Sequence, residues 1–325
     1  MGCSLGEGCG ICCAVALPIG DPKSLFGFPA NSLGVFQKNL LSGDGGAGSE
    51  EAGTPIPPIY LEPFAFTWNQ VADLEERAMT QSADLVLVMN EEMREFASNC
   101  WGIDKKGVKI VPNPYIPEGK TPSNSPEKKV IGFIGRLEPR KGVLELAKAL
   151  CQVLHDFPEW KVKIAGSSTG SCVSGTDPGA VVKKMLARLR DQIEFQDRIE
   201  PSDVPNWLVS VGVCVFPSIW ETFSYVTLEA AQAGRAIIGT RTGAVPDILD
   251  NGRAGEIVPP GDAKALALAL RKLMADGELR RELGAAARKR FEDRFHPDRV
   301  MKEILEVYRE AVFRAEARKK KFEVE

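Results

Sequence analysis

The chain has 325 residues, of which 44% are hydrophobic and 26% are charged, and its formal net charge is −3. This length suffices for two domains with hydrophobic cores, and the composition is that of a globular protein. The small negative charge argues against nucleic acid or an anionic membrane as the main partner. No apolar run approaches the length of a transmembrane helix and no signal peptide is apparent, so we expect a cytoplasmic protein.

The first 53 residues have the composition of a linker. They contain 12 of the 31 glycines and four of the eight cysteines. Cysteines scattered along a chain without a secretion signal are typical of reduced thiols. The pair in "CGIC" leaves a metal or redox site open, although no second pair at matching spacing accompanies it. We expect residues 1–53 to be a glycine-rich, poorly ordered segment.

Residues 54–114 carry the patterns of a partial α/β domain. Apolar residues recur at helical spacing in two stretches, and two short apolar runs have the length of buried strands. Gly102 is placed to end the second helix, and prolines follow the second strand. The expected order is a helix at 68–82, a strand at 83–90, a helix at 91–102 and a strand at 107–114.

Residues 115–128, "YIPEGKTPSNSPEK", are rich in Pro, Ser and Lys, which indicates a linker between domains. Beyond them, short apolar strands alternate with amphipathic helices, and this alternation predicts a parallel, doubly wound sheet in a domain at 129–292. The expected strands are at 129–136, 161–167, 193–197, 212–218 and 235–240, and the helices between them at 142–157, 180–192, 201–210 and 224–234. Helices at 244–250, 262–276, 277–295 and 296–321 complete the chain, and we expect residues 293–325 to pack back toward the N-terminal domain.

Two turns of this predicted sheet carry charged residues at a strand-to-helix junction. In "GRLEPRKG" glycines such as Gly135 let the backbone approach a ligand, and Arg136 and Lys141 suit a diphosphate. In "WETFSYVTLEA" Glu221 precedes a helix and Glu229 lies within it. Such sheets bind ligands at the carboxyl ends of their strands, where both turns lie. Taken singly, each charge is better explained as a solvated residue near a helix start.

Neither turn matches a motif for dinucleotides or nucleoside triphosphates. "GRLEPRKG" lacks G-x-G-x-x-G, and no acidic residue ends the second strand, "KVKIAGS", where a dinucleotide ribose would bind. The P-loop pattern G-x-x-x-x-G-K-[ST] is also missing. These absences argue against NAD enzymes and NTPases.

The order of the motifs resembles one family. "GRLEPRKG", "KVKIAG", "VCVFPSIWETFSYVTLEAAQAGRAIIGTRTGAVPDIL" and "NGRAGEIVPPGDAKALALAL" follow one another as in the retaining GT-B glycosyltransferases of family 4, the group 1 glycosyl transferases. The resemblance covers residues 84–295, and its specific parts are the spacings G-R-x4-K-G and E-x7-E. It implies a GT-B fold, in which a doubly wound, Rossmann-like donor domain accompanies an N-terminal acceptor domain that is short here.

The resemblance also assigns roles to the charged residues. It implies that Arg136 and Lys141 bind the donor diphosphate and stabilise the leaving nucleotide. Glu221 is expected near the transferred sugar, and Glu229 is expected to accept charge-assisted hydrogen bonds from the ribose hydroxyls. Arg136, Lys141 and Glu221 are therefore the catalytic candidates, and Gly135 belongs to the same donor-binding set.

The chain departs from the family pattern directly after Glu221. Family members usually read E-G-F-G there, whereas this chain has "ETFS". Backbone N–H groups of Thr222, Phe223 and Ser224 are still expected to meet phosphate or sugar oxygens at the helix start. We expect the Thr222 and Ser224 side chains to narrow the approach to the sugar and to add hydroxyl donors.

Two further departures concern the base and the acceptor. Asp197 stands where the family commonly has a glycine, and Arg198 and Ile199 are the candidates there for contacts with the nucleobase. Only about the last third of an acceptor domain is legible, and the family's cleft histidine has no counterpart. His155 is expected on a helix surface and His296 at the start of the last helix.

The resemblance implies a hexosyltransferase that moves a sugar from a nucleotide diphosphate sugar to an acceptor hydroxyl with retention. The acceptor is an unknown carbohydrate, lipid or small molecule, and no metal or other cofactor is expected. A non-catalytic nucleotide-sugar-binding module stays open because the acceptor half is short, and an NDP-sugar epimerase is a weaker alternative. The incomplete half also leads us to expect self-association, and peripheral binding to a membrane stays open.

Overall fold

The computed structural model describes residues 77–83, 85–116, 128–168 and 175–322. The chain divides into two compact units, Leu87–Glu310 and a second one that combines Met1–Val86 with Ala311–Glu325. The expected poorly ordered segment 1–53 lies outside the described residues, and so does most of the linker at 115–128. Of the helix expected at 68–82, residues 77–82 are described, and residues 77–81 among them are helical.

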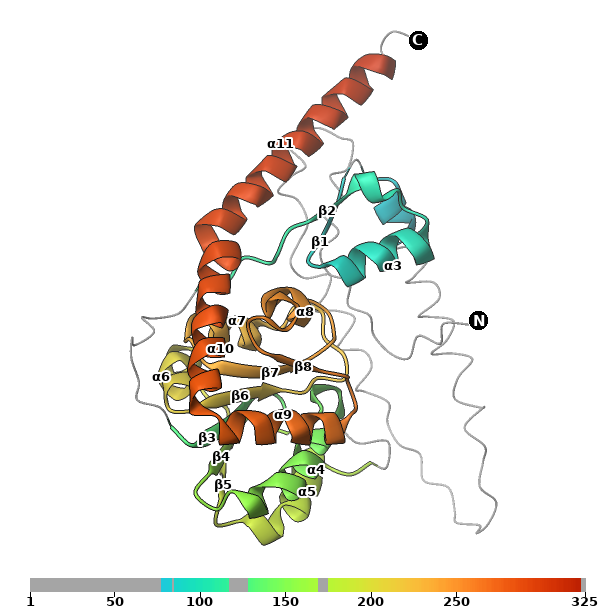
Figure 1. The fold of residues 1–325 in the computed structure, drawn as a ribbon. Helices are drawn as coiled ribbons and strands as arrows, with labels where there is room; N and C mark the ends of the chain where they lie inside the picture. The colour runs from blue at the N-terminus through green and yellow to red at the C-terminus, as the bar shows by residue number, and fades with distance from the viewer. Residues whose placement is uncertain (1–76, 84, 117–127, 169–174, 323–325) are drawn as a thin grey trace, which may run out of the picture. The chain divides into compact units, whose positions relative to one another are not determined.

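The larger unit is built on a six-stranded sheet in which every pair of neighbours is parallel. The strand order is β5-β4-β3-β6-β7-β8 (Figure 1). Its central strands are buried on both faces, which explains why they read as continuous apolar runs rather than as alternating patterns. The strands are β3 (Val130–Ile134), β4 (Lys161–Ala165), β5 (Ile193–Gln196), β6 (Val213–Phe216), β7 (Ala236–Thr240) and β8 (Glu256–Val258).

Helices cover both faces of this sheet, and each face has its own hydrophobic core (Figure 1). On one face α4 (Val143–Val153), α5 (Pro178–Met185) and α9 (Ala263–Ala275) contribute to the core. On the other face the helices are α6 (Val204–Val209), α7 (Tyr225–Gln232), α8 (Val245–Ile248) and α10 (Gly277–Arg290). The predicted doubly wound parallel sheet is therefore confirmed.

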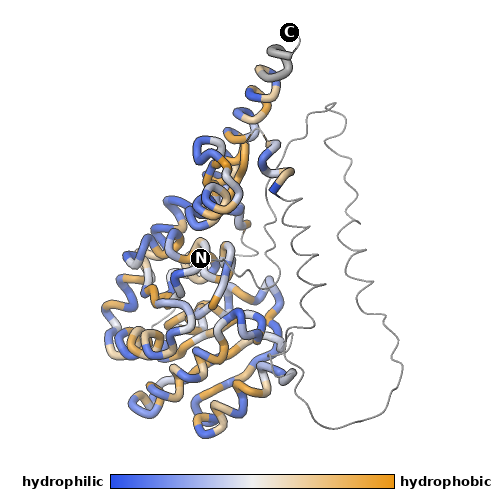
Figure 2. The backbone as a smooth tube through the Cα atoms, turned by 90° about the vertical axis from the view of Figure 1, so that its right-hand side faces the viewer, coloured by the Kyte–Doolittle hydropathy of each residue, from blue (hydrophilic) through white to orange (hydrophobic). Residues whose placement is uncertain are grey.

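The hydropathy of the chain follows this layering. Hydrophobic segments gather in the sheet and on the inner sides of the helices, while the outer turns are mostly hydrophilic (Figure 2).

The last helix, α11 (Pro297–Phe322), follows a π-helical turn at Phe291–Phe295. His296 directly precedes α11, at the helix start that the sequence predicts, and its Nδ1 accepts the Asp298 N–H at 3.3 Å. Among the described helices, none is long and apolar enough to cross a membrane.

A smaller sheet of two strands, β1 (Val86–Val88) and β2 (Val108–Ile110), lies in the N-terminal part of the described chain. Between them, α3 (Glu91–Trp101) begins at Asn90, whose side chain accepts the Met93 N–H. The helix ends at Gly102, in the left-handed conformation with φ 68°. The strand–helix–strand order and the glycine stop agree with the sequence prediction.

Two details of the larger unit differ from the prediction. The strand β8 was not expected, because its three residues are too few to form a recognisable apolar run. The helix expected at 180–192 begins earlier and ends earlier, as α5. Its start is fixed by Asp177, whose carboxylate accepts the N–H groups of Gly179 and Ala180.

Candidate functional site

The strand order places both charged turns at one point of the sheet. β3 and β6 are neighbours in the sheet but are separated in the chain by β4 and β5, which lie on the far side of β3. The chain therefore winds outward in one direction from β3 and in the other direction from β6. In such sheets the carboxyl ends at this reversal form the crevice where ligands bind. The turn after β3 and the turn after β6 lie at this place.

The turn after β3 is pressed against the end of β6. Pro139–Lys141 forms a short 3-10 turn that ends at Gly142, with φ 68°. A Cβ on Gly142 would lie 1.8 Å from the carbonyl oxygen of Pro217, so no larger residue fits there without a shift. The Ile219 N–H also donates to the Arg140 carbonyl at 2.8 Å. Backbone packing and a backbone hydrogen bond thus join the two turns.

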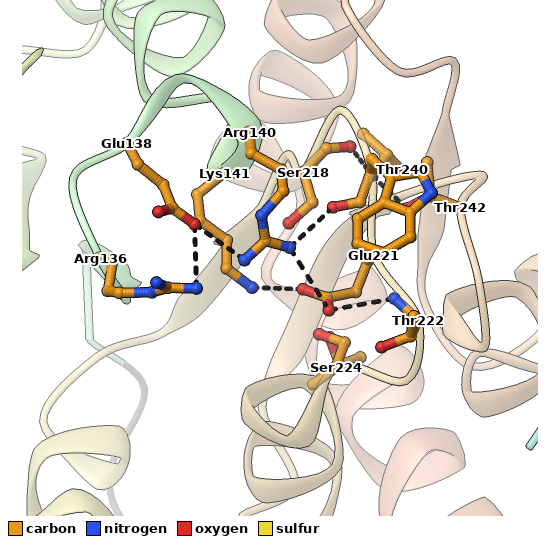
Figure 3. A network of polar contacts seen from close by, with 12 residues as sticks. Arg136, Glu138, Arg140, Lys141, Ser218, Glu221, Thr222, Ser224, Thr240 and Thr242 are labelled. Carbon is orange, nitrogen blue, oxygen red and sulfur yellow. Dashed lines mark hydrogen bonds and ion pairs between the residues drawn. The ribbon is translucent and has the colours of Figure 1, made fainter. Parts of the chain in front are cut away.

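An ion pair between side chains spans the same gap. Figure 3 shows Lys141 reaching from the first turn to Glu221 on the second. The Lys141 ammonium forms an ion pair and a hydrogen bond with the Glu221 carboxylate. The Glu221 side chain is only 9% exposed and that of Lys141 is 20% exposed. Arg140 lies farther away, with its Nη1 3.9 Å from Glu221 Oε1. The two residues that the sequence assigned to different motifs therefore meet in space.

A second carboxylate organises the arginines of the first turn (Figure 3). Glu138 Oε1 lies 3.2 Å from Arg136 and 2.8 Å from Arg140. In this network Arg136, Arg140 and Lys141 carry three positive charges, and Glu138 and Glu221 carry two negative charges. The network therefore has one net positive charge, which favours an anionic ligand. The Arg136 side chain is 56% exposed, so its guanidinium is accessible to such a ligand.

Arg140 and Glu138 were not among the residues singled out from the sequence, although both stand inside "GRLEPRKG". Arg140 Nη1 also donates to the carbonyl of Trp220 at 3.2 Å, and its guanidinium lies 5.6 Å from the centre of the Trp220 ring. The sequence shows Arg140 only as a third cation in this octapeptide. Its connection to the other turn is a tertiary contact, which spacing alone does not reveal.

The turn after Glu221 has a strained backbone. Ser224 takes φ 65° and ψ 74°, the left-handed conformation that favours glycine, at the position where the family pattern has its second glycine. Its hydroxyl is buried and forms a 2.7 Å hydrogen bond with the Thr227 hydroxyl. This bond lies within the start of α7, and either oxygen can be its donor, so donation from Ser224 to the sugar stays a prediction.

The other members of this turn are also held by the fold. The Thr222 N–H donates to Glu221 Oε1 at 3.1 Å, which orients the carboxylate. The Phe223 ring is buried in the core and contacts Tyr225 edge-on, with the ring centres 5.4 Å apart. Contacts of the Thr222, Phe223 and Ser224 N–H groups with a donor stay a prediction.

The remaining predicted site residues lie elsewhere along the carboxyl edge of the sheet or in α7. Glu229 lies in α7 and is half-buried rather than on an open helix surface. Arg198 is exposed and Ile199 is packed against the core that contains Phe223. Both follow β5, which β4 separates from β3, so the structure does not join them to the network of Glu221. Gly135 directly follows β3.

The described residues hold no group of three or more His, Cys, Asp or Glu side chains that could bind a metal ion. His155 is exposed, as expected for a helix-surface residue. Among the cysteines, Cys214 lies inside β6, and burial raises the pKa of its thiol to about 12. This residue is therefore part of the core rather than a reactive group.

Comparison with known proteins identifies the family. The family model for "Glycosyl transferases group 1" matches residues 117–290, which is more than half of the chain. The chain belongs to this family. The match contains both charged turns and all six strands of the larger sheet. The resemblance read from "GRLEPRKG" and the E-x7-E spacing is thus confirmed at the level of the group 1 glycosyl transferases.

Two curated relatives illustrate the range of the family. The chain is 24% identical over 276 residues to the alpha-maltose-1-phosphate synthase of Mycolicibacterium smegmatis, which is 78% of this chain and 70% of the relative. It is 27% identical over 227 residues to the D-inositol 3-phosphate glycosyltransferase of Corynebacterium jeikeium, 65% of this chain and 54% of the relative. The chain therefore spans between about half and about two thirds of these relatives.

Solved structures share the GT-B fold. The Anabaena protein Alr3699/HepE in complex with UDP superimposes with a TM-score of 0.63 at 20% identity, over 78% of this chain and 70% of that chain. Sucrose-phosphate synthase from Thermosynechococcus elongatus gives a TM-score of 0.57 at 24% identity, over 74% of this chain and 61% of that chain. The fold class predicted from the sequence is confirmed by these neighbours.

Proposed function

We propose that this chain binds a nucleotide diphosphate sugar at the two joined turns and transfers the sugar to an acceptor hydroxyl with retention of configuration. The observation that supports this most directly is the pairing of Lys141 with Glu221 across the carboxyl ends of β3 and β6. A cation for phosphate and a carboxylate for sugar hydroxyls stand side by side there. Membership of the group 1 glycosyl transferases supports the same conclusion.

In this proposal the first turn receives the diphosphate. The exposed Arg136 offers a planar fork of N–H donors, and Lys141 offers a compact ammonium beside it. Their positive charge stabilises the negative charge that develops on the leaving nucleotide as the bond to the sugar breaks. No resident metal is needed for this task in the proposal.

The second turn and α7 receive the sugar and the ribose. Glu221 accepts hydrogen bonds from the transferred sugar, and Glu229 accepts them from the ribose hydroxyls. The acceptor oxygen bonds to the anomeric carbon on the face from which the diphosphate leaves, and the departing phosphate takes the acceptor proton. Retention follows from this front-face path, as expected for family 4.

A non-catalytic nucleotide-sugar-binding module is the second candidate. It would use the same donor-binding residues but would have no acceptor site. The donor site lies within the matched residues 117–290, so donor binding does not depend on which candidate is correct. An epimerase acting on NDP-sugars is a weaker third candidate, since no observation favours it.

The test is to incubate the pure protein with UDP-, GDP- and ADP-sugars and to measure both binding and release of the nucleoside diphosphate. Binding together with hydrolysis, or with transfer to an added acceptor, supports the transferase. Binding alone identifies the non-catalytic module. If none of the nucleotide sugars binds, the proposed function is wrong.

A further inference from the structure

Asn90 connects the segment before the donor domain to the turn that carries Glu221. It is fully buried, at 0% exposure, and it begins α3 by accepting the Met93 N–H on its Oδ1 at 2.9 Å. Its amide nitrogen points the other way and donates to the carbonyl of Thr222 at 2.7 Å. One side chain thus makes a helix cap and a contact with the residue directly after Glu221.

The backbone of Thr222 links this contact to the carboxylate of Glu221, because its carbonyl and its N–H belong to the two consecutive peptide groups on either side of one Cα. Its carbonyl accepts the Asn90 amide and, at 3.1 Å, the Ala244 N–H. The N–H of the same residue donates to Glu221 Oε1 at 3.1 Å. Because Asn90 and Ala244 fix the carbonyl of residue 222, they also help to fix the direction in which Glu221 points toward Lys141.

Further contacts of α3 act on the same region. The Glu92 carboxylate accepts the Gly243 N–H at 2.6 Å. A Cβ on Gly243 would lie 2.2 Å from the Glu221 carbonyl oxygen, so the loop after β7 packs closely on the turn after β6. Met89 and Met93, on either side of Asn90, pack into the hydrophobic core that also contains Phe223. The start of α3 is therefore a packed part of the donor site's support.

The strain in the turn explains why such support matters. Ser224 holds a left-handed backbone, which is unfavourable for any residue other than glycine. A strained conformation persists only where the surroundings determine it from several sides. Asn90 and Ala244 at Thr222 provide two of these constraints two residues before Ser224.

We propose that Asn90 is a positioning residue of the donor site, which helps to orient the Glu221 carboxylate through the backbone of Thr222. This inference rests on the proposed function, in which Glu221 contacts the sugar rather than the nucleotide. Loss of the Asn90 amide should then reduce the extra affinity that the sugar adds to the nucleoside diphosphate. It should leave the affinity for the nucleoside diphosphate itself almost unchanged.

The main variant is Asn90→Asp, which keeps an oxygen to cap α3 but replaces the amide donor that faces Thr222. Asn90→Ala removes the amide without adding a buried charge, and it serves if the aspartate variant fails to fold. The matched control is Asp104→Asn, the reverse exchange at another cap of the same segment, where Oδ1 accepts the Lys106 N–H at 3.0 Å. Asn at position 104 can form the same cap.

The measurement is calorimetric titration of each protein with a nucleoside diphosphate and with its sugar, taken from the UDP, GDP and ADP pairs that the wild type binds. We expect the ratio of the two affinities to fall about tenfold in the Asn90 variants and to stay unchanged in the control. Equal losses for both ligands, or an unchanged ratio in a folded variant, would overturn the positioning role. Failure of the wild type to bind any pair would instead refute the proposed function.

Discussion

The two turns of the site are built in opposite ways. The turn after β3 carries its charges on exposed or partly exposed side chains and is fixed mainly by the contact between Gly142 and Pro217. The turn after β6 contains the strained Ser224 and is held by buried side chains and by Asn90 from another part of the chain. Substitution of a charged residue on the first turn should therefore change ligand binding more than stability. A substitution in the second turn should change both ligand binding and stability.

The largest effect is expected where the two turns touch. Gly142→Ala forces a left-handed alanine and places its Cβ 1.8 Å from the Pro217 carbonyl oxygen, so we expect a loss of at least about 3 kcal/mol of unfolding free energy. Gly102→Ala is the matched control, because it has the same φ of 68° but no atom within 4 Å of the added Cβ. That control should lose only about 1 kcal/mol.

Chemical denaturation of both variants separates steric contact from backbone strain. If Gly142→Ala loses no more stability than Gly102→Ala, the close approach of the two turns is wrong. In that case the joining of the turns would depend on the Lys141 ion pair and on the hydrogen bonds of Arg140 to Ile219 and Trp220.

The next largest effect concerns the cation that bridges the turns. Lys141→Ala should weaken binding of a nucleoside diphosphate by about 1–3 kcal/mol and hardly change binding of the free nucleoside, because only the diphosphate meets the ammonium. It also leaves the mostly buried Glu221 without its nearest cation, so some stability is lost as well.

Lys148→Ala is the control for Lys141, since Lys148 is 55% exposed and its Nζ lies 3.5 Å from Glu145 on the surface of α4. Titration calorimetry should detect no change in diphosphate affinity for this variant. An equal loss of nucleoside affinity in Lys141→Ala would contradict the assignment of Lys141 to the diphosphate.

A loss of binding comparable to that of Lys141→Ala, but with less effect on stability, is expected in α7, where Glu229 is half-buried and is proposed to hold the ribose. Glu229→Ala should weaken nucleotide binding by about 1–3 kcal/mol through loss of charge-assisted hydrogen bonds. The comparison of a nucleotide with its 2′,3′-dideoxy form sharpens this test. The wild type should prefer the ribonucleotide and the variant should not, and a preference that survives in the variant would reassign Glu229.

The parts of the site that could be read from the sequence are those encoded locally. Arg136 and Lys141 lie in one octapeptide, Glu221 and Glu229 lie in one strand-to-helix stretch, and both stretches follow apolar strands. Parallel topology then brings their ends to one edge of the sheet. This reasoning placed the two turns correctly without any knowledge of tertiary contacts.

The parts that the sequence reading missed depend on contacts between distant residues. In the sequence Asn90 is the last residue of the strand expected at 83–90, and only the fold brings its amide to Thr222, 132 positions away. The Arg140 bond to the Trp220 carbonyl spans 80 positions. The hydrogen bond between the Ser224 and Thr227 hydroxyls was likewise not predicted. Such pairings are set by packing, which spacing along the chain does not encode.

The smallest effect tests the strain in the second turn. At Ser224, both Ser224→Gly and Ser224→Ala lose the hydroxyl bond to Thr227, but only glycine adopts φ 65° without steric penalty. We therefore expect the glycine variant to be more stable than the alanine variant by about 1 kcal/mol.

Ser98, inside α3, is the control, because there we expect the alanine variant to be more stable than the glycine variant. Alanine is favoured over glycine by about 1 kcal/mol in a helix. Thermal unfolding of the four variants should give opposite orders at the two positions. The same order at both would mean that Ser224 is not strained, and the need for Asn90 to hold this turn would be weakened with it.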